Sequence, residues 1–429
     1  MEMMPRTAEA RSFRTFLWIW FGQLVSGIGS GLSGFALGVH AYAQSHSATD
    51  FSLIVLCSLA PSIVFKPLGG VLADRFDRRL MMMLGDLGAG LGVAMIVLVM
   101  LAGDAPLWQI CCGLAFSSLF MALQNPACKV LVTDLVPASD YARVSGLVQL
   151  AFASQYLISP VIAAYLLSVA DIRSVLLIDV ASFGVAGLTV LSVMKKIPGH
   201  GASATPVSEG LVRSLAAGWA AVCAQRDVLI LVIILSLLTF YVGLLQTLLG
   251  PMILSFADAA VLGTILSVSA TGVLVCSALI GVFGKTLKPA TLLVAGLLLA
   301  AVSLAGLGAV TRVWAMLAAG FLFFSSLPLI NTGAEVLIRT RIDNHVQGRA
   351  WGIIGVLTQM GYLVAYGSAG PLADRVFSPL LMDGGALAAR LGPWIGSGPG
   401  RGIGLLFIVA GASVLLLAGA TVRARLARQ

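Results

Sequence analysis

Twelve long apolar segments are the strongest constraint on what this chain can fold into. Each has roughly 20 or more residues, the length that a helix needs to cross the hydrocarbon core of a bilayer. We therefore predict an all-α membrane protein with twelve transmembrane helices. The segments lie at about 14–43, 51–73, 80–102, 106–133, 143–169, 173–194, 228–255, 259–283, 289–309, 312–338, 347–373 and 401–422.

Composition excludes a soluble protein. Only 10% of the 429 residues are charged and 59% are hydrophobic, whereas soluble domains carry about 25% charged residues. One or two soluble domains could not enclose this much apolar surface. The first segment is longer than the roughly 7 to 15 apolar residues of a cleavable signal peptide, so we expect no segment to be removed.

The distribution of basic residues predicts the orientation. Nineteen of the 26 lysine and arginine residues lie in connections on one side of the predicted membrane, and five lie on the other side. Because basic connections stay in the cytoplasm, both termini are expected there, in a multi-pass protein of the cell (inner) membrane. The net charge of +8 is thus a topology signal, and we expect no nucleic acid as a partner.

The longest cytoplasmic connection divides the chain into two six-helix halves, residues 1–194 and 228–429. The connection, 195–227, carries apolar residues at spacings of three and four, which predict an amphipathic helix on the membrane surface. A plain surface helix and a regulatory arm are both open interpretations. The apolar residues of this helix are Val207, Leu211, Leu215, Trp219 and Val222.

A charged loop between the second and third segments, 70–79, resembles the signature loop of the major facilitator superfamily. The matching residues are Gly70, Asp74, Arg75, Arg78 and Arg79. Asp77 stands where the general pattern has glycine, and this ending resembles the branch of drug:H⁺ antiporters that includes macrolide efflux and enterobactin exporters. The resemblance extends to four later stretches, at 124–127, 177–183, 346–349 and 370–375. It implies two pseudo-symmetric six-helix bundles.

The resemblance also implies a latch at the inner face. Asp74 ends the second segment, and the eleventh begins near Gln347 on the same face. A helix N-terminus carries about +0.5 charge and unpaired N–H groups, so the Asp74 carboxylate can dock there and close the inner gate. A plain charged loop that obeys the positive-inside rule is the alternative. The remaining residues of the expected latch are Gly70, Arg75, Arg78, Arg79 and Asp134.

Two further copies of loop-like sequence occur in the second half. The stretch 281–288 keeps glycine and basic residues at the place where a duplication predicts an echo of the signature loop. Leu372-Ala373-Asp374-Arg375 repeats residues 72–75 but lies on the predicted outer face, where we expect local chemistry at a helix end. The glycine-rich stretch that follows, 374–400, is expected to be a loose outer loop, either a lid or an inert connection.

The fifth segment contains Ser159-Pro160-Val161-Ile162-Ala163-Ala164, which resembles an antiporter signature with serine and alanine in place of glycine. Proline bends a helix, and small residues let helices approach closely. Packing alone would also explain Ser159, Pro160, Ala163 and Ala164.

Ionisable residues inside apolar segments are costly and are candidates for proton binding. Asp179 is deepest, although a structural role is equally open. Asp86 is expected to join the charge cluster under the signature loop. Glu335 precedes Arg339 by four residues, which favours an ion pair on one helix face.

Uncharged polar residues are candidates for the wall of a central cavity. Their amides and phenols on apolar helices suit a bulky amphipathic ligand, and helix-to-helix hydrogen bonds are the alternative. These residues are Gln23, Gln124, Asn125, Tyr156, Tyr241, Gln246, Asn331 and Gln359.

Together these patterns predict a secondary transporter that exports a hydrophobic or amphipathic small molecule by alternating access, driven by protons. A dedicated siderophore or lipid carrier is the alternative, followed by a non-transporting receptor. The sequence has no phosphate-binding loop and its four histidines are scattered, so we expect no enzyme, cofactor or metal. The expected partners are the substrate, protons and the lipid bilayer, and we expect a monomer.

Overall fold

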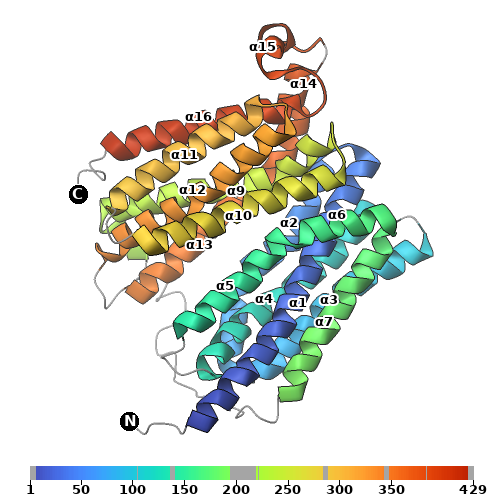
Figure 1. Ribbon diagram of the computed structural model, residues 1–429, viewed down its shortest axis with the longest axis vertical. Coiled ribbons are helices and arrows are strands. Elements are labelled where there is room, and N and C mark those ends of the chain that lie inside the picture. Colours follow the sequence, from blue (N-terminus) through green and yellow to red (C-terminus); the bar gives the residue numbers. More distant parts are fainter. Residues whose placement is uncertain are drawn as a thin grey trace. The chain divides into compact units, whose positions relative to one another are not determined.

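The computed structural model describes residues 6–103, 105–135, 141–193, 219–220, 222–283, 288–342, 347–382 and 384–423. The chain divides into two compact units (Figure 1). The first comprises residues 1–43 and 53–206, and the second comprises 44–52 and 207–429. The division runs through two helices, because the last two residues of α1 and the beginning of α2 belong to the second unit while the rest of both helices belongs to the first.

The first unit is a bundle of long helices. α3 lies against both α4 and α7 in this bundle. The helices are α1 (Arg6–Ser45), α2 (Ala48–Arg75), α3 (Arg78–Ala102), α4 (Leu107–Leu135), α5 (Tyr141–Leu157), α6 (Ser159–Val169) and α7 (Ile172–Val193).

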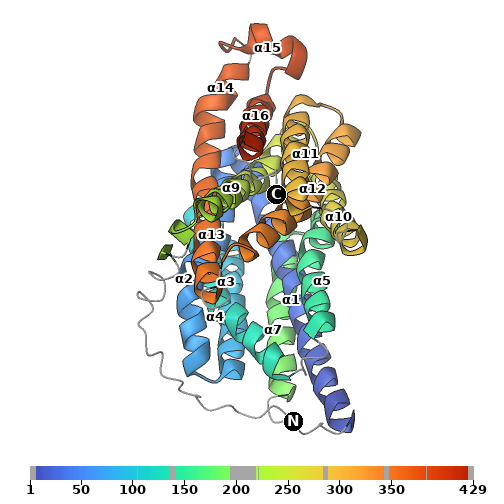
Figure 2. The same cartoon turned by 90° about the vertical axis from the view of Figure 1, so that its left-hand side faces the viewer.

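The second unit is also a helical bundle. Figure 2 shows α9 beside α13 and α11 beside α16, two pairs with extensive contact. The helices are α9 (Arg226–Leu254), α10 (Ala259–Phe283), α11 (Pro289–Ala309), α12 (Val313–Arg339), α13 (Gln347–Leu372), the π-helix η3 (Ala373–Phe377), α14 (Ser378–Leu381), α15 (Ala388–Ile395) and α16 (Arg401–Arg423).

Every predicted apolar segment is helical in the structure. Ten of the described helices are long and apolar enough to cross a membrane. The other two predicted spans are α13, which carries Thr358 and Gln359 near its middle, and the pair α5 and α6. The twelve-helix, all-α prediction is therefore confirmed.

The fifth predicted segment is a broken helix. α5 ends at Leu157 and α6 begins at Ser159, with Pro160 at the start of α6. Proline has no N–H to donate and its ring displaces the preceding turn, so it ends or bends a helix at this position. The sequence predicted the bend but placed one continuous span over 143–169.

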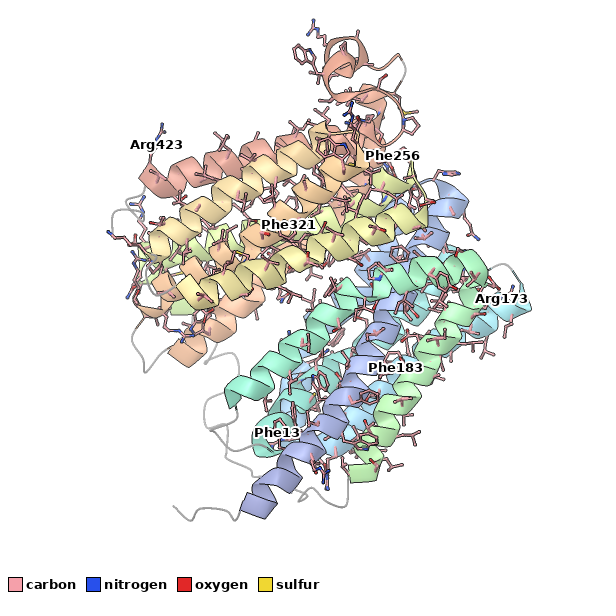
Figure 3. All side chains as sticks on the ribbon, in the orientation of Figure 1. Phe13, Arg173, Phe183, Phe256, Phe321 and Arg423 are labelled. Atoms are coloured by element: carbon pink, nitrogen blue, oxygen red, sulfur yellow. The ribbon has the colours of Figure 1, made fainter. Side chains whose placement is uncertain are left out.

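Apolar side chains fill the space between the helices of each unit. In the first unit, Leu37 of α1, Ile96 of α3 and Leu176 of α7 are almost fully buried in one cluster. Figure 3 shows Phe183 of α7 within the same packed interior, and Phe13 and Arg173 toward opposite ends of the unit. In the second unit, Phe256 and Arg423 lie at opposite ends. This burial supplies most of the packing that holds the polar groups described below in place.

The glycine-rich stretch 374–400 differs from the expected loose loop. It contains η3, α14 and α15, and Leu381 is fully buried. Gly384, Gly396, Gly398 and Gly400 adopt positive φ angles between 77° and 106°, which explains the density of glycine there. Most of the predicted linker, including Val207, Leu211 and Leu215, lies outside the described residues.

Candidate functional site

A buried carboxylate and two amides form a polar chain across three helices of the first unit. Asp86 of α3 has only 1% of its surface exposed. The Nε2 of Gln23, on α1, donates a hydrogen bond of 3.2 Å to the Asp86 Oδ2. The Nε2 of Gln124, on α4, donates in turn to the Oε1 of Gln23. The structure thus brings one predicted acid together with two predicted cavity residues.

Close packing of α3 on α4 places Gln124 in this chain. A methyl group at Gly85 would come within 3.0 Å of the Gln124 Cα. Glycine at position 85 therefore allows the backbones to approach, and Asp86 follows it directly.

The surroundings of Asp86 differ from those that the sequence predicted. Asp86 was expected to join the charge cluster under the signature loop, but it accepts a hydrogen bond from the Gln23 amide, and no lysine or arginine of the described residues forms an ion pair with it. Its Oδ1 is buried without a hydrogen-bond partner. Asp86 does not reach the charge cluster of the signature loop because two helical turns separate it from Arg79.

Asp179 of α7 lies in a second polar cluster, made of serines. The Ser182 hydroxyl lies 3.3 Å from Asp179 Oδ1 and donates a bond of 2.7 Å to the Asp179 carbonyl. The hydroxyls of Ser30 and Ser33, on α1, are buried and form no hydrogen bond to the described residues. Gly29 lets α1 approach α7 at this cluster, because a methyl group there would clash with Ser182.

The proline motif ties the broken fifth helix to α1. Ser159, Pro160, Ala163 and Ala164 are all buried. The Ser159 hydroxyl donates a hydrogen bond of 2.9 Å to the carbonyl of Ile28. The small residues therefore serve close packing, and the serine adds a fixed polar contact that glycine could not make.

The signature loop is described only in part. Asp77 is the N-cap of α3, and its Oδ1 accepts a bond of 2.9 Å from the Arg79 N–H. The Arg79 guanidinium pairs with the same carboxylate at 2.5 Å. This bond holds the pKa of Asp77 below its ordinary value. Arg78 is half-buried, and the side chains of Gly70, Asp74, Arg75 and Asp134 lie outside the described residues.

Polar residues of the second unit form uncharged pairs. The Tyr241 hydroxyl of α9 lies 2.7 Å from the Ser413 hydroxyl of α16. The Tyr366 hydroxyl of α13 donates a bond of 2.8 Å to the Gln246 amide oxygen of α9. Two of the predicted cavity residues thus have partners on neighbouring helices.

The remaining predicted residues are not brought together. Asn125 donates a bond of 3.0 Å to the carbonyl of Met121 on its own helix, and its side chain is exposed. Tyr156 and Asn331 are exposed and Gln359 is half-buried. Glu335 forms the expected ion pair with Arg339 at 2.6 Å, and both side chains are more than half exposed.

Sequence reasoning missed the partners Ser413 and Tyr366, because a single hydroxyl on an apolar helix carries no signal of what it faces. It also misassigned Asp374. Instead of serving its own helix end, the Asp374 carboxylate accepts four hydrogen bonds from residues 47–49, at the beginning of α2. The repeat of residues 72–75 at 372–375 drew attention to Asp374 but gave no indication of its partners.

Comparison with known proteins gives matches over most of the chain. The sequence model described as Major Facilitator Superfamily matches residues 19–366. Macrolide efflux protein A of Streptococcus pyogenes is 27% identical over 372 residues, covering 84% of this chain and 90% of that protein. The uncharacterized MFS-type transporter YfiS of Bacillus subtilis is 25% identical over 364 residues, 82% and 85% of the two chains.

Solved structures share the fold. The nucleoside transporter NupG superposes with a TM-score of 0.74 at 12% identity, covering 95% of this chain and 98% of that one. A bacterial homologue of the iron transporter ferroportin, in an inward-facing state, gives a TM-score of 0.72 at 14% identity, covering 96% and 98%. At these identities the likeness concerns the fold alone.

Proposed function

Because the chain belongs to the Major Facilitator Superfamily, we propose that it exports hydrophobic or amphipathic small molecules of the macrolide type by alternating access, driven by inward proton flow. The chain is a multi-pass transporter of the cell membrane, with ten described helices that are long and apolar enough to span it. The proposal therefore concerns the substrate, the direction and the energy source.

The similarity to Macrolide efflux protein A carries the substrate part of the proposal. It covers 84% of this chain and 90% of that protein, so both halves of the transporter contribute. The polar groups of the second unit agree with such a substrate, because Tyr241 and Gln246 present a phenol and an amide on apolar helices. Uncharged polar groups on apolar walls suit a large amphipathic molecule better than an inorganic ion.

Asp86 is our candidate for the coupling proton. Removing an ionised carboxylate from water costs several kcal/mol unless a cation pairs with it, and no described cation does so. Its free Oδ1 can carry the proton, while Oδ2 keeps its bond from Gln23. Gln124 extends the chain to α4, one of the helices expected to line the cavity.

The other two candidate acids are less suited to carry a proton through a cycle. Asp179 accepts a hydrogen bond from the Ser182 hydroxyl of its own helix, and a hydroxyl can serve either protonation state of the carboxyl group. Glu335 is exposed and paired with Arg339, so water and a cation stabilise its charge. We assign them structural roles, and we retain the inner latch of Gly70, Asp74, Arg75, Arg78, Arg79 and Asp134 as part of the proposal.

The test is an accumulation assay in cells with and without the protein. A panel of dyes, macrolides and siderophores is measured before and after the proton gradient is collapsed. We expect lower accumulation of macrolides and apolar dyes, lost on collapse. Accumulation differences that remain after the proton gradient is collapsed would contradict proton coupling. An effect confined to siderophores would show that the substrate is a siderophore and not a molecule of the macrolide type.

A further inference from the structure

We propose that the Asp179 carboxylate and three serine hydroxyls form a binding site for a monovalent cation of the size of sodium, between α1 and α7 of the first unit. The bound cation joins the two helices and balances a buried charge. This role is structural, so it depends neither on the substrate nor on the proton that drives transport. The three serines are Ser30, Ser33 and Ser182.

Two glycines of α1 determine how α1 is paired with α7, which lies beside it in Figures 1 and 2. A methyl group at Gly22 would clash with the Thr189 hydroxyl. A methyl group at Gly29 would clash with the Ser182 hydroxyl and would lie 2.7 Å from Asp179 Oδ1. From the first contact to the second, the chain advances by seven residues on α1 and goes back by seven on α7. The two helices are therefore antiparallel and closely packed here.

This pairing brings the two serines of α1 to the level of the carboxylate. Ser33 lies one turn after Gly29 on the same face of α1. One further turn along the antiparallel pair places Ser33 opposite Ile178, the neighbour of Asp179 in the sequence. Ser30 precedes Ser33 by three residues, a spacing that puts both on one side of the helix. The carboxylate and the hydroxyls thus lie at one depth between the two helices.

The serine oxygens at this level have lone pairs to offer. Ser30 Oγ and Ser33 Oγ are buried without a hydrogen-bond partner among the described residues, and only 3% of the Ser33 surface is exposed. A buried hydroxyl without a partner costs free energy. The single proton of the Ser182 hydroxyl is shared between the Asp179 carbonyl at 2.7 Å and Asp179 Oδ1 at 3.3 Å. From the described residues, the carboxylate therefore receives only the longer branch of one shared hydrogen bond.

Charge balance determines which ligand fits this set of oxygens. Asp179 has 1% of its surface exposed, and no lysine or arginine of the described residues forms an ion pair with it. A buried carboxylate without a cation is costly. One carboxylate balances one positive charge, whereas a divalent ion would leave a net charge in the membrane interior. Hard cations prefer oxygen ligands, and the close packing at Gly29 favours a small ion, so we infer sodium.

The other buried carboxylate of the first unit has surroundings that disfavour a cation. Asp86 accepts a hydrogen bond of 3.2 Å from the Gln23 amide N–H, and Gln124 extends the chain. An amide N–H directs partial positive charge at the carboxylate, whereas a hydroxyl can turn its oxygen lone pairs toward a cation. The two acids therefore suit different ligands, a proton for Asp86 and a metal cation for Asp179.

The experiment measures thermal unfolding of the purified protein in detergent, without substrate. NaCl is compared with choline chloride at equal ionic strength and pH, because choline is too large to enter between closely packed helices. We expect the unfolding temperature to rise with NaCl concentration and then to level off. At saturation it should exceed the value in choline chloride by about 2 to 4 °C, the shift for a ligand at about ten times its dissociation constant.

Variants of the cluster should remove this response. Asp179→Asn should unfold at the same temperature in both salts, because an amide cannot balance the charge of a cation. Ser33→Ala removes one oxygen ligand and should raise the NaCl concentration needed for half of the effect about tenfold.

Two matched controls should keep the full response to NaCl. Ser269 is also a fully buried hydroxyl without a partner among the described residues, but its helix, α10, carries no acidic residue. Ser269→Ala should therefore respond to NaCl as the parent does. Asp86→Asn should do so as well, because it changes the other buried carboxylate of the same unit.

Equal unfolding temperatures of the parent protein in the two salts would overturn the proposal, and would show that a proton or water occupies the cluster. A NaCl response that Ser33→Ala and Asp179→Asn both keep would also overturn it. If Asp179→Asn does not fold, Ser33→Ala decides alone, because it removes a single oxygen atom from the packed interior. Failure of the proposed function would leave the NaCl response in place while the parent exports none of the panel compounds.

Discussion

The two units share one architecture but bury different kinds of polar group. The first buries two carboxylates, Asp86 and Asp179, each with 1% of its surface exposed. In the second, two hydrogen bonds join uncharged side chains of neighbouring helices, Tyr241 with Ser413 and Tyr366 with Gln246. The charged side chain that is buried among its described residues, Arg401, serves helix ends.

This difference suggests a division of labour. A carboxylate inside a membrane protein binds a proton or finds a cation, because its charge is costly there. Hydroxyl and amide pairs carry no charge and recognise uncharged polar groups of a ligand. Under the proposed function, we therefore place proton coupling in the first unit and substrate contacts in the second, and each part can be tested.

The largest effect is expected from Asp86→Asn. Asparagine keeps the shape and can still accept the bond from Gln23, but it cannot bind and release a proton. Cells with this variant should accumulate macrolide as cells without the protein do. Glu335→Gln is the control, since Glu335 is exposed, and it should export like the parent. Proton-dependent export by Asp86→Asn would contradict the proposal that Asp86 in the first unit couples export to protons.

Arg401→Met tests whether the buried charge of the second unit is structural. Its guanidinium donates to the carbonyls of Gly308 at 3.0 Å and Val310 at 3.3 Å, at the end of α11. Losing these bonds should lower the free energy of unfolding by about 1 to 3 kcal/mol. Thermal unfolding in detergent measures this. Arg390→Met, at an exposed position, should leave the unfolding temperature unchanged.

Asp179→Asn should have a smaller effect on transport. The Ser182 hydroxyl can donate to a carboxamide oxygen as well as to a carboxylate, so this hydrogen bond is retained. We expect efflux rates close to those of the parent, with unchanged dependence on the proton gradient. If this variant, and not Asp86→Asn, uncouples efflux from the proton gradient, then Asp179 on α7 binds the coupling proton in place of Asp86.

Tyr241→Phe should alter preference among substrates. The change removes one hydroxyl from the pair with Ser413, worth about 0.5 to 1.5 kcal/mol. Relative efflux of two panel compounds should shift by a few-fold, while proton dependence stays the same. Ser303, whose hydroxyl bonds within its own helix at 2.6 Å, provides the control Ser303→Ala. A change in proton dependence would contradict the assignment to the second unit.

The smallest effect is expected at Asp77, which stabilises the start of α3. Since its pKa is lowered in the folded protein, its ionised form contributes stability at neutral pH, and this is lost as pH falls below the ordinary value of 3.8. Asp77→Asn keeps a capping residue and loses the pair with Arg79. In thermal unfolding it should be slightly less stable than the parent at pH 7, and the difference should shrink as the pH falls below 3.8.

Hydropathy alone predicts most of this fold. Each apolar segment is helical because a backbone in lipid must satisfy its own hydrogen bonds. Pro160 predicted the bend in the fifth span. The small-residue contacts between helices, such as Gly85 on Gln124, could not be predicted, because they depend on the rotation of each helix about its axis.

The candidate site was predictable in its residue types and not in its pairings. The cost of burial identified Asp86 and Asp179, whereas the amide partners of Asp86 became evident only in the structure. Asp374 shows the limit most clearly. Its carboxylate bonds to Thr49, 325 residues away along the chain, and no periodicity relates two such segments.

The break in the fifth span has a mechanical consequence. α6 has 11 residues, a rise of about 16 Å, which is roughly half the thickness of the hydrocarbon core. The interruption at Ile158 therefore falls near the depth where the two lipid leaflets meet. Proline removes one backbone hydrogen bond at this break, and the Ser159 bond to the carbonyl of Ile28 fixes the junction of the two pieces to α1.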